Sequence, residues 1–355
     1  MARFHTLKVA DIRRETADCV SVAFEVPEYL KPEYKFIQGQ YLTLKLKVNG
    51  EEIRRSYSIC SGTVGDSELR VAVKRVKDGK ASGYINEVLK TGDGIEVMTP
   101  MGNFHSRLSP DNAKKYFLFA GGSGITPMLS IIRSVLNTEK KSVIRLFYGN
   151  LDEASTIFYH DITELEKSSG GKLKVYFIFD KPAGKTEPLL TGILSQEKVR
   201  ALFDSFCGIG LNHEYFVCGP GPMMDNVKKV IEEKKVPASQ FHIEYFTAVT
   251  EAVKSTVPEA EVVTSKVTVS MYGIETSFEL RSDGKCILDA ALDAGVDVPF
   301  ACKGAVCCTC RGKILEGKVK MDQNFALTES EGAEGFILTC QSHPLTPVVK
   351  VDYDS

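Results

Sequence analysis

The sequence has no run of about 18 apolar residues, the length of a membrane-spanning helix, and its start, MARFHTLKVADI, contains no apolar signal core. We therefore expect a cytoplasmic protein without a membrane partner. A formal net charge of -2 gives no general reason to expect nucleic acid as a partner. Only six histidines occur, and no Glu-x-x-His pair of the di-iron kind, so the chain is not expected to activate oxygen itself.

The composition is that of a globular protein. At 355 residues the chain is long enough for two or three domains, each with its own core. Hydrophobic residues make up 43% and charged residues 25%. The ten cysteines are better explained by a metal site than by disulfides, because disulfides rarely persist in the cytoplasm.

Four of the cysteines lie in PFACKGAVCCTCRGK, residues 299–313. Zinc sites of four cysteines usually consist of two C-x2-C pairs. Here Cys302, Cys307 and Cys310 follow the spacing C-x4-C-x2-C, and Cys340 follows 30 residues later. This is the plant-type ferredoxin spacing, which predicts a 2Fe–2S cluster bound by these four cysteines.

The residues between the cysteines suit such a cluster. Gly304, Ala305 and Thr309 are small, so backbone N–H groups can approach the bridging sulfides. Cys308 is the spare cysteine. If it replaced Cys307, a single residue would separate it from the next ligand, which leaves the loop little room to turn, and we expect Cys308 to be a small buried side chain.

The sequence around the cluster motif completes a domain. KVTVSMYGIETSFEL (266–280) alternates about a Tyr-Gly turn, which predicts a hairpin. ILDAALDAG (287–295) has helical spacing and ends at a glycine, and VKVDY near the C-terminus reads as a strand. Together these segments resemble the β-grasp fold of plant-type ferredoxins.

A flavin is the expected source of single electrons, because it accepts a hydride and releases its two electrons one at a time. RSYS (55–58) ends an alternating segment with a turn at Asn49-Gly50. Tyr57 offers a ring for stacking, Ser58 a hydroxyl for flavin N5 and Arg55 a charge for phosphate. By itself the pattern is better explained by chance, because a tyrosine in a strand usually belongs to the core.

The later motifs favour a flavin site over a chance occurrence of R-x-Y-S. GKAS (79–82) leads into a predicted helix whose first N–H groups could bind a pyrophosphate. YFLFAGGSGITPMLSII (116–132) reads as a strand, a glycine-rich turn and a helix, which suits a dinucleotide phosphate although it is not the G-x-G-x-x-G fingerprint. Strands and helices then alternate as far as EYFVCGPGPMM, which predicts a parallel doubly wound sheet.

In their order and spacing, RSYS, GKAS, GGSGITP and CGPGPMM resemble the ferredoxin–NADP reductase superfamily over residues 1–246. With the C-terminal ferredoxin domain, the whole chain resembles oxygenase reductase components. The stretch from PFACKGAVCCTC through GFILTCQSHPLTPVVKVDYD is most similar to reductase subunits of phenylacetyl-CoA epoxidases. Reductases of 3-ketosteroid 9α-hydroxylases share the domain order.

This resemblance implies FAD rather than FMN, although relatives with FMN share R-x-Y-S, and it implies the residues of both nucleotide sites. The flavin positions are Arg55, Ser56, Tyr57 and Ser58, the backbone of Val73, Lys74 and Arg75, the pyrophosphate-binding Gly79, Lys80, Ala81 and Ser82, and Glu244 and Phe246 beside the flavin. The nicotinamide positions are Gly121, Gly122, Gly124, Thr126, Lys181 and Cys218. Of these, Ser58, Cys218 and Glu244 would face the reacting atoms. Cys218 could instead be a buried strand cysteine, Glu244 a surface acid and Phe246 a core aromatic.

The resemblance favours NADPH as the electron donor, whereas the local charges favour NADH. NADP-preferring relatives usually place Ser and Arg after the strand that here reads VYFIF, where they hold the 2′-phosphate. This chain has Asp180 and Lys181, and GNLDEAS (149–155) supplies acids but no Arg. Lys181 and Lys185 could bind phosphate, whereas Asp180 would repel it or accept a ribose hydroxyl. We expect NADPH and leave NADH open.

We therefore predict a multidomain chain with four segments. These are an antiparallel β-barrel flavin domain (1–107), an α/β doubly wound nicotinamide domain (108–247), a polar linker (248–264) and an α+β β-grasp ferredoxin domain (265–355).

Electrons would pass from NAD(P)H through FAD and the 2Fe–2S cluster, and leave by the exposed rim of the cluster loop at residues 303–305. The expected acceptor is a separate oxygenase, with the di-iron phenylacetyl-CoA epoxidase as first choice and 3-ketosteroid or ring-hydroxylating oxygenases as alternatives. A non-catalytic iron–sulfur redox sensor is the alternative from another class, but it would not need RSYS, GGSGITP and CGPGPMM together.

Overall fold

The computed structural model describes residues 3–66, 68–184, 187–246 and 262–355. The chain divides into two units. The N-terminal unit consists of Phe4–Ile53 and Tyr57–Glu244, and the C-terminal unit of Tyr245–Ser355 with short pieces around Arg3 and Arg54–Ser56. None of the helices in the described segments is long and apolar enough to cross a membrane.

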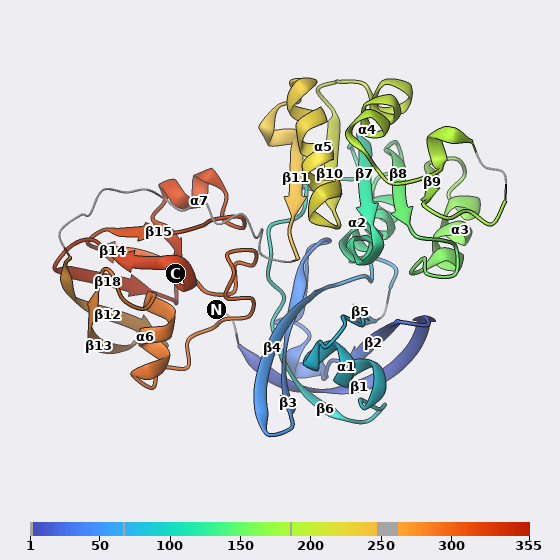
Figure 1. Ribbon diagram of the computed structural model, residues 1–355. Coiled ribbons are helices and arrows are strands. Elements are labelled where there is room, and N and C mark those ends of the chain that lie inside the picture. Colours follow the sequence, from blue (N-terminus) through green and yellow to red (C-terminus); the bar gives the residue numbers. More distant parts are fainter. Residues whose placement is uncertain (1–2, 67, 185–186, 247–261) are drawn as a thin grey trace. The chain divides into compact units, whose positions relative to one another are not determined.

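The N-terminal unit begins with a six-stranded sheet in the order β4-β3-β6-β1-β2-β5, which curls into a half-barrel (Figure 1). Its strands are β1 (Phe4–Thr16), β2 (Cys19–Glu25), β3 (Tyr41–Val48), β4 (Glu51–Ser58), β5 (Leu69–Lys74) and β6 (Gly94–Met98). Asn49 (φ 52°) and Gly50 (φ 85°) form the predicted two-residue turn between β3 and β4. Helix α1 (Lys80–Glu87) packs Ala81 and Ile85 into the apolar core of this sheet.

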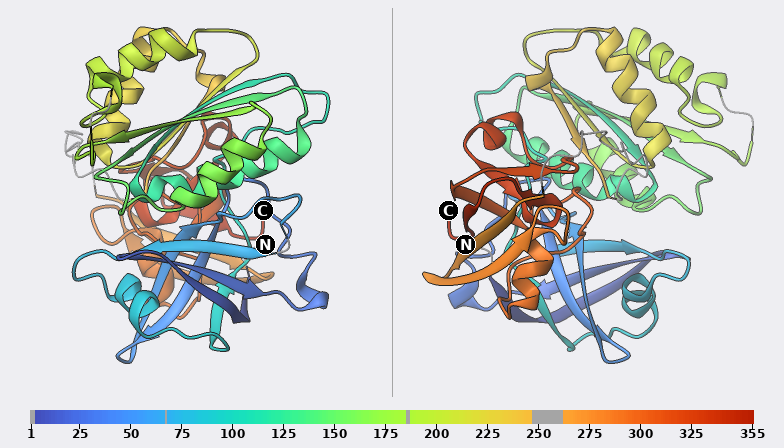
Figure 2. Two further views of the ribbon diagram at one scale, coloured as in Figure 1. Left: turned by 90° about the vertical axis from the view of Figure 1, so that its right-hand side faces the viewer. Right: turned by 60° about the vertical axis from the view of Figure 1, so that its left-hand side comes forward.

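A parallel five-stranded sheet in the order β11-β10-β7-β8-β9 forms the rest of this unit. Its strands are β7 (Lys115–Gly121), β8 (Val143–Asn150), β9 (Leu173–Phe179), β10 (His213–Cys218) and β11 (Phe241–Glu244). Helices α2 (Ile125–Thr138) and α3 (Tyr159–Ser168) cover one face, and α4 (Gln196–Leu202) and α5 (Gly221–Glu233) cover the other (Figure 2). The sheet is doubly wound, as predicted.

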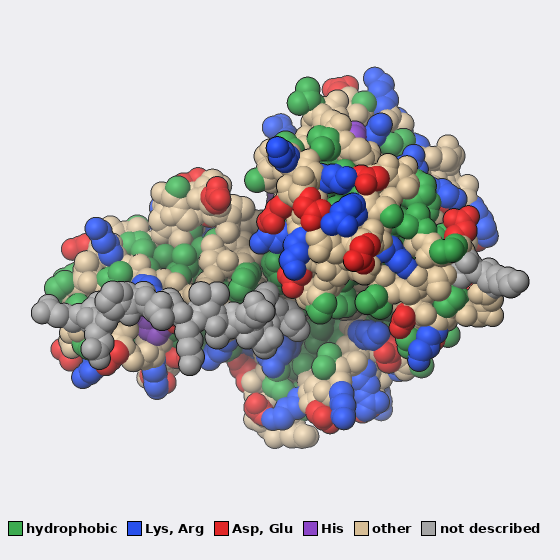
Figure 3. All heavy atoms as spheres, turned by 45° about the horizontal axis from the view of Figure 1, so that its top comes forward, with side chains coloured by type: hydrophobic (Ala, Val, Ile, Leu, Met, Phe, Trp, Pro, Cys, Tyr) green, Lys and Arg blue, Asp and Glu red, His purple; other side chains and the backbone are tan. Residues whose placement is uncertain are grey.

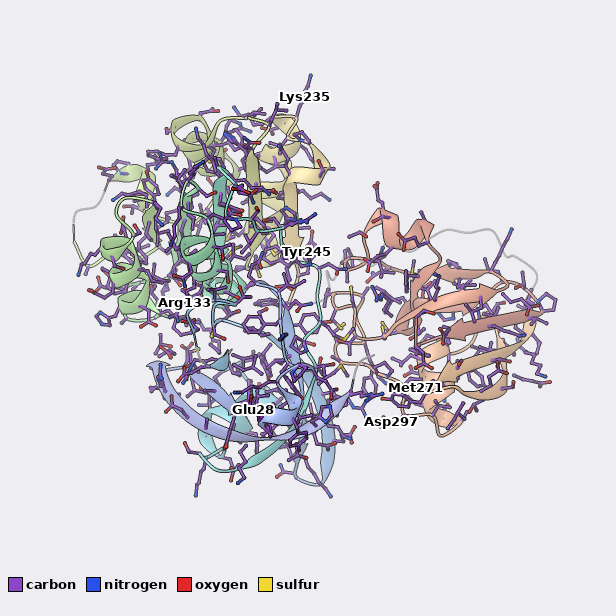
Figure 4. All side chains as sticks on the ribbon, turned by 180° about the vertical axis from the view of Figure 1, so that it is seen from behind. Glu28, Arg133, Lys235, Tyr245, Met271 and Asp297 are labelled. Carbon is purple, nitrogen blue, oxygen red and sulfur yellow. The ribbon has the colours of Figure 1, made fainter. Side chains whose placement is uncertain are left out.

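Polar contacts tie α2 to the segment between β4 and β5 of the half-barrel and to α3. Arg133, labelled in Figure 4, lies on α2 and forms ion pairs with Asp66 (2.9 Å) and Asp161 (3.0 Å). The Thr63 backbone N–H donates to Ser134 Oγ of the same helix at 3.0 Å. On the face drawn in Figure 3, positive and negative side chains intermingle over this unit, which agrees with the small net charge.

The C-terminal unit contains a five-stranded sheet in the order β13-β12-β18-β14-β16 and a two-stranded sheet, β15-β17. The strands are β12 (Thr264–Met271), β13 (Ile274–Arg281), β14 (Arg311–Glu316), β15 (Val319–Met321), β16 (Phe336–Leu338), β17 (Ser342–Pro344) and β18 (Val348–Asp352), with helices α6 (Ile287–Asp293) and α7 (Glu329–Ala333). The predicted hairpin turns at Tyr272 (φ 53°) and Gly273 (φ 72°), and the predicted helix ends before Gly295 (φ 82°).

Three apolar clusters correspond to the three large sheets, although the half-barrel and the parallel sheet form one compact unit. The predicted fold classes are confirmed. The boundaries at residues 107, 247 and 265 stay a prediction, and most of the predicted linker lies outside the described residues, as does Lys185.

Candidate functional site

The parallel sheet has a switch point between β7 and β10. These strands are hydrogen-bonded neighbours, with Ala120 opposite Cys218. The chain leaves β7 toward β8 and β9, and then returns to β10 on the other side. In open α/β sheets, ligands bind at the carboxyl ends of the strands at such a point. Both glycine motifs, GGSGITP and CGPGPMM, follow these two strands.

Two of the glycines are required by contact between the turns. A Cβ atom on Gly124 would lie 2.1 Å from the carbonyl oxygen of Cys218, and one on Gly121 would lie 2.7 Å from Met223 Sδ and Pro220 Cδ. Gly122 differs, because nothing lies within 4 Å of its added Cβ and its φ is +51°. The open space at Gly122 makes it the best of the three for close approach of a phosphate.

The first turn of α2 is held in place by neighbouring hydroxyl groups. Thr126 Oγ1 donates to the Ser123 carbonyl at 3.1 Å, and Tyr148 Oη donates to the Gly122 carbonyl at 3.0 Å. The first N–H groups of a helix have no partner within the helix and carry a partial positive charge. They therefore lie at the switch point as candidate donors to an anionic group.

The structure brings Ser58, Cys218 and Glu244 together from three strands. Ser58 is buried at the end of β4, and its hydroxyl donates to Glu244 Oε2 at 3.3 Å. Glu244 ends β11, directly opposite Cys218 on β10. Burial, followed by the neighbouring Glu244 charge, raises the pKa of the Cys218 thiol, so Cys218 is a neutral, apolar wall and not a nucleophile.

Glu244 is the titratable group of this cluster. Although its side chain is only half-buried by surface area, enclosure by protein raises its pKa to about 8, and the Ser58 hydrogen bond opposes part of that shift. Between its usual pKa and about 8 the folded state binds more protons than the unfolded state, so Glu244 makes the protein less stable as the pH rises through this window.

We expect Glu244→Gln to remove this pH dependence. The wild type should lose on the order of 1–3 kcal/mol of stability relative to the variant between pH 5 and 8, a range reduced to allow for the partial exposure. The measurement is the melting temperature of both proteins across this range. If the melting temperatures of the two proteins changed in parallel between pH 5 and 8, the Glu244 carboxyl would be ionised over this whole range and the raised pKa would be contradicted.

The predicted pyrophosphate segment uses some of its groups internally. The Gly79 N–H donates to the Val76 carbonyl at 3.0 Å, and Ser82 Oγ accepts from the Val76 N–H at 3.1 Å. A groove of about 410 Å³ borders the start of α1 and is lined in part by Arg75 and Lys80. The first-turn N–H groups of α1 are candidate donors to a phosphate, whereas the Gly79 N–H is already used. Arg75 pairs with Glu87 at 2.7 Å and Lys80 with Glu51 at 2.5 Å, so a phosphate bound here would compete with these two ion pairs.

The other flavin positions lie as strand geometry dictates. Tyr57 packs against the core of the half-barrel and is half-buried, and Arg55 on the same strand is exposed. Val73 is fully buried and its carbonyl accepts from Asn86 Nδ2 at 3.0 Å, and the contact of its backbone with the flavin stays a prediction. Phe246 is 40% exposed and belongs to the C-terminal unit. Its place beside the flavin stays a prediction.

The four predicted cluster ligands meet as two pairs. The Cys307 thiol donates to Cys302 Sγ at 3.1 Å, and the Cys310 thiol donates to Cys340. Among the described residues, no three His, Cys, Asp or Glu side chains converge as a metal-ion site requires. Two cysteine pairs are the protein ligands that the two irons of a 2Fe–2S cluster take. Figure 4 shows sulfur atoms gathered among the loops of this unit.

Backbone N–H groups surround these pairs. The Cys307 hydrogen bond and backbone N–H groups, including that of Gly304 at 3.3 Å, lower the pKa of Cys302 to about 6. The Ala305 N–H donates to Cys340. Lys303 (φ 51°) and Ala305 (φ 63°) adopt the left-handed conformation, which turns successive N–H groups inward. A ring of donors around four thiols fits an anionic iron–sulfur cluster.

Three details go beyond the sequence or correct it. The Cys308 thiol donates to the Ala326 carbonyl at 3.1 Å and lies in the core, apart from the two pairs. The Thr309 hydroxyl donates to Cys307, a role its small size did not indicate. The predicted exit rim is narrower than expected, because Lys303 is exposed but Ala305 is fully buried.

Comparison with known proteins agrees with this arrangement. Three family models match the chain: an oxidoreductase FAD-binding domain at residues 6–106, an oxidoreductase NAD-binding domain at 118–229 and a 2Fe-2S iron-sulfur cluster binding domain at 270–345. Fold and site thus define an oxidoreductase that binds FAD and a pyridine nucleotide and carries a 2Fe–2S domain.

Relatives of known function extend over the whole chain. One subunit of the 1,2-phenylacetyl-CoA epoxidase from Escherichia coli is 40% identical over 100% of this chain and 99% of its own length. The ferredoxin reductase component of 3-ketosteroid-9-alpha-monooxygenase from Rhodococcus rhodochrous is 30% identical over 98% of this chain and 96% of its own. The structure of phthalate dioxygenase reductase, described as modular for electron transfer from pyridine nucleotides to [2Fe-2S], aligns over 98% of both chains with a TM-score of 0.59 and 26% identity.

The chain belongs to the family of flavin- and 2Fe–2S-containing reductase components of oxygenases.

Proposed function

We propose that this chain takes electrons from NADPH and delivers them to a di-iron oxygenase that epoxidises phenylacetyl-CoA. The observation that carries this proposal is the 40% identity to a subunit of a 1,2-phenylacetyl-CoA epoxidase over 100% of this chain and 99% of that subunit, against 30–33% for the 3-ketosteroid components. We also infer a cytoplasmic location. All ten cysteines lie in the described part of the chain, and none of them forms a disulfide there.

The side chains at the switch point would support hydride transfer by positioning the two nucleotides and excluding water, and not by acid or base chemistry. Bound flavin would supply the conversion of a two-electron donor into single electrons. Ser58 and Glu244 offer a hydroxyl and a carboxyl where a flavin edge would lie, and the buried Cys218 keeps water from that side. The proposed cluster ligands are Cys302, Cys307, Cys310 and Cys340, and the thiol contacts of Cys307 with Cys302 and of Cys310 with Cys340 support this set.

NADPH is favoured by the charges after β9. The Asp180 and Lys181 backbone N–H groups donate to the carbonyls of Asn150 and Leu151, so both residues lie at the carboxyl edge of the sheet. Asp152 accepts from the Ser155 N–H at 2.9 Å and is directed into its own turn. Lys198 lies within electrostatic range of Asp180 and offsets its charge. Lys181 is exposed and lies within electrostatic range of Asp152, and we propose it as the cation that binds a 2′-phosphate.

We expect Lys181→Ala to lower kcat/KM for NADPH by roughly 3–10-fold, the effect of losing an exposed cation, and to leave kcat/KM for NADH unchanged. Asp180→Asn should act in the opposite direction and improve the use of NADPH. Steady-state reduction of ferricyanide with each nucleotide measures both ratios. An equal loss with both nucleotides in Lys181→Ala would contradict the assignment.

The proposed acceptor is tested by reconstitution. With NADPH alone, the chain should reduce cytochrome c and leave phenylacetyl-CoA unchanged. Adding the other components of a phenylacetyl-CoA epoxidase should start oxygen uptake that depends on that substrate. Reconstitution with the oxygenase of a 3-ketosteroid system is the matched control. Faster turnover with the steroid oxygenase would assign the chain to that system, and oxidation of an organic substrate by the isolated chain would overturn the reductase assignment.

A further inference from the structure

The side chain of Gln341 lies beside the last of the proposed cluster ligands. It belongs to a 3-10 turn, Thr339–Gln341, and is half-buried. Its amide Nε2 donates to the Lys303 carbonyl at 3.3 Å and to the Cys340 carbonyl at 3.0 Å. The same nitrogen lies 3.7 Å from Cys340 Sγ, within hydrogen-bonding distance of a sulfur acceptor.

These contacts join two segments that are far apart in the sequence. Lys303 is the crest of the cluster loop and holds a left-handed conformation (φ 51°). Its ammonium pairs with Asp289 of α6 at 2.7 Å and lies 4.9 Å from the Phe300 ring centroid. Gln341 holds the backbone carbonyl of the same residue. The crest is thereby fixed relative to Cys340, the ligand supplied by the distant segment.

The contact with Cys340 has an electrostatic consequence. The Ala305 N–H and the Gln341 amide both direct donors at this sulfur. Donors directed at cluster sulfurs stabilise the reduced state, which carries one more negative charge, and so raise the reduction potential. The other donors to the cysteines named above are backbone N–H groups, the Thr309 hydroxyl or a neighbouring cysteine. A backbone donor cannot be removed by a side-chain substitution without disturbing the loop, whereas the Gln341 amide can.

We propose that Gln341 is a positioning residue that raises the reduction potential of the cluster and holds the crest of its loop. This inference rests on the proposed ligand set. Gln341 itself binds no iron. Its amide makes the cluster a better acceptor for electrons from the flavin, because a higher cluster potential favours the forward step.

The test is an anaerobic redox titration of the purified full chain, followed by visible absorption and by the electron paramagnetic resonance of the reduced cluster. At the potential where half of the wild-type clusters are reduced, Gln341→Leu should show a reduced-to-oxidised ratio about 3–10-fold lower, equivalent to a shift of roughly 30–60 mV for a one-electron couple. Gln341→Glu keeps the shape but loses the donors, and it should shift the ratio in the same direction. Gln341→Asn, which retains an amide, should lie closer to wild type.

Gln323→Leu is the matched control, because Gln323 lies in the same unit and has no hydrogen bond to a cysteine among the described residues. Its potential should equal that of the wild type. Wild-type potentials in both Gln341→Leu and Gln341→Glu, with the cluster retained, would overturn this inference alone. If Gln341→Leu failed to assemble a cluster, the potential of Gln341→Glu alone would test the inference, and a wild-type value in that variant would overturn it. A wild-type chain that assembled no cluster would instead overturn the ligand set, and with it the inference.

Discussion

Cys307→Ser is expected to abolish electron delivery to the oxygenase while NADPH still reduces the flavin. Cys307 is a proposed iron ligand and lies 3.1 Å from its partner Cys302. Mutating a residue that hydrogen-bonds to a metal ligand typically lowers activity by ~10–100-fold, and losing the ligand itself should lower it further. We therefore expect the rate of cytochrome c reduction to fall by on the order of a hundredfold or more. Flavin reduction should persist, because most of the proposed flavin positions, among them Tyr57, Ser58 and Glu244, lie in the N-terminal unit and not in the unit that holds the cysteines. Stopped-flow absorbance and iron content measure the two steps separately.

Cys308→Ser is the control for this experiment. Its thiol donates to the Ala326 carbonyl and has no place in either cysteine pair. Serine can make the same hydrogen bond, so the cluster and its electron transfer should be retained. Loss of the cluster in Cys308→Ser together with an intact cluster in Cys307→Ser would show that the ligand register is shifted by one residue.

Gly124→Ala is expected to suppress hydride transfer from NADPH by at least about a hundredfold, the cost of moving a reacting group by ~1 Å. The added Cβ would lie 2.1 Å from the Cys218 carbonyl oxygen, which belongs to the backbone and cannot rotate away. The two turns at the switch point must separate, and overpacking of this kind also costs about 1–3 kcal/mol of stability. Single-turnover flavin reduction and the melting temperature measure the two effects.

Gly221→Ala is the matched control in the same pair of motifs. Nothing lies within 4 Å of a Cβ on Gly221, which begins α5, and alanine is a better helix former than glycine. This variant should reduce its flavin as fast as wild type. Near wild-type hydride transfer in Gly124→Ala would mean that the turns can separate without disturbing the nucleotide.

Local patterns in the sequence predicted the elements of the fold well. The turns at Asn49-Gly50 and Tyr272-Gly273 and the stop before Gly295 follow from residues that tolerate a positive φ, and all three are present. The alternation of strands and helices predicted the parallel sheet, because that order leaves few other topologies. What local patterns could not show was which turns meet, since that depends on strand order.

The glycines of GGSGITP illustrate this limit. They were predicted to make room for phosphates, yet Gly121 and Gly124 are glycines because the other glycine-rich turn packs against them. That turn is separated from them by about a hundred residues of chain, and only the pairing of β7 with β10 brings the two together. Ser58, Cys218 and Glu244 likewise gather from three strands and two different sheets.

By itself, the sequence determined the class of this protein. The spacing C-x4-C-x2-C with a distant fourth cysteine specifies a kind of cluster, because thiolate spacing along one loop is local geometry. Only the tertiary structure decided how the cysteines pair, that Cys308 faces the core, that Ala305 is buried, and that enclosure raises the pKa of Glu244 to about 8. Burial and pairing depend on neighbours from distant segments, and a single sequence carries no record of which segments become neighbours.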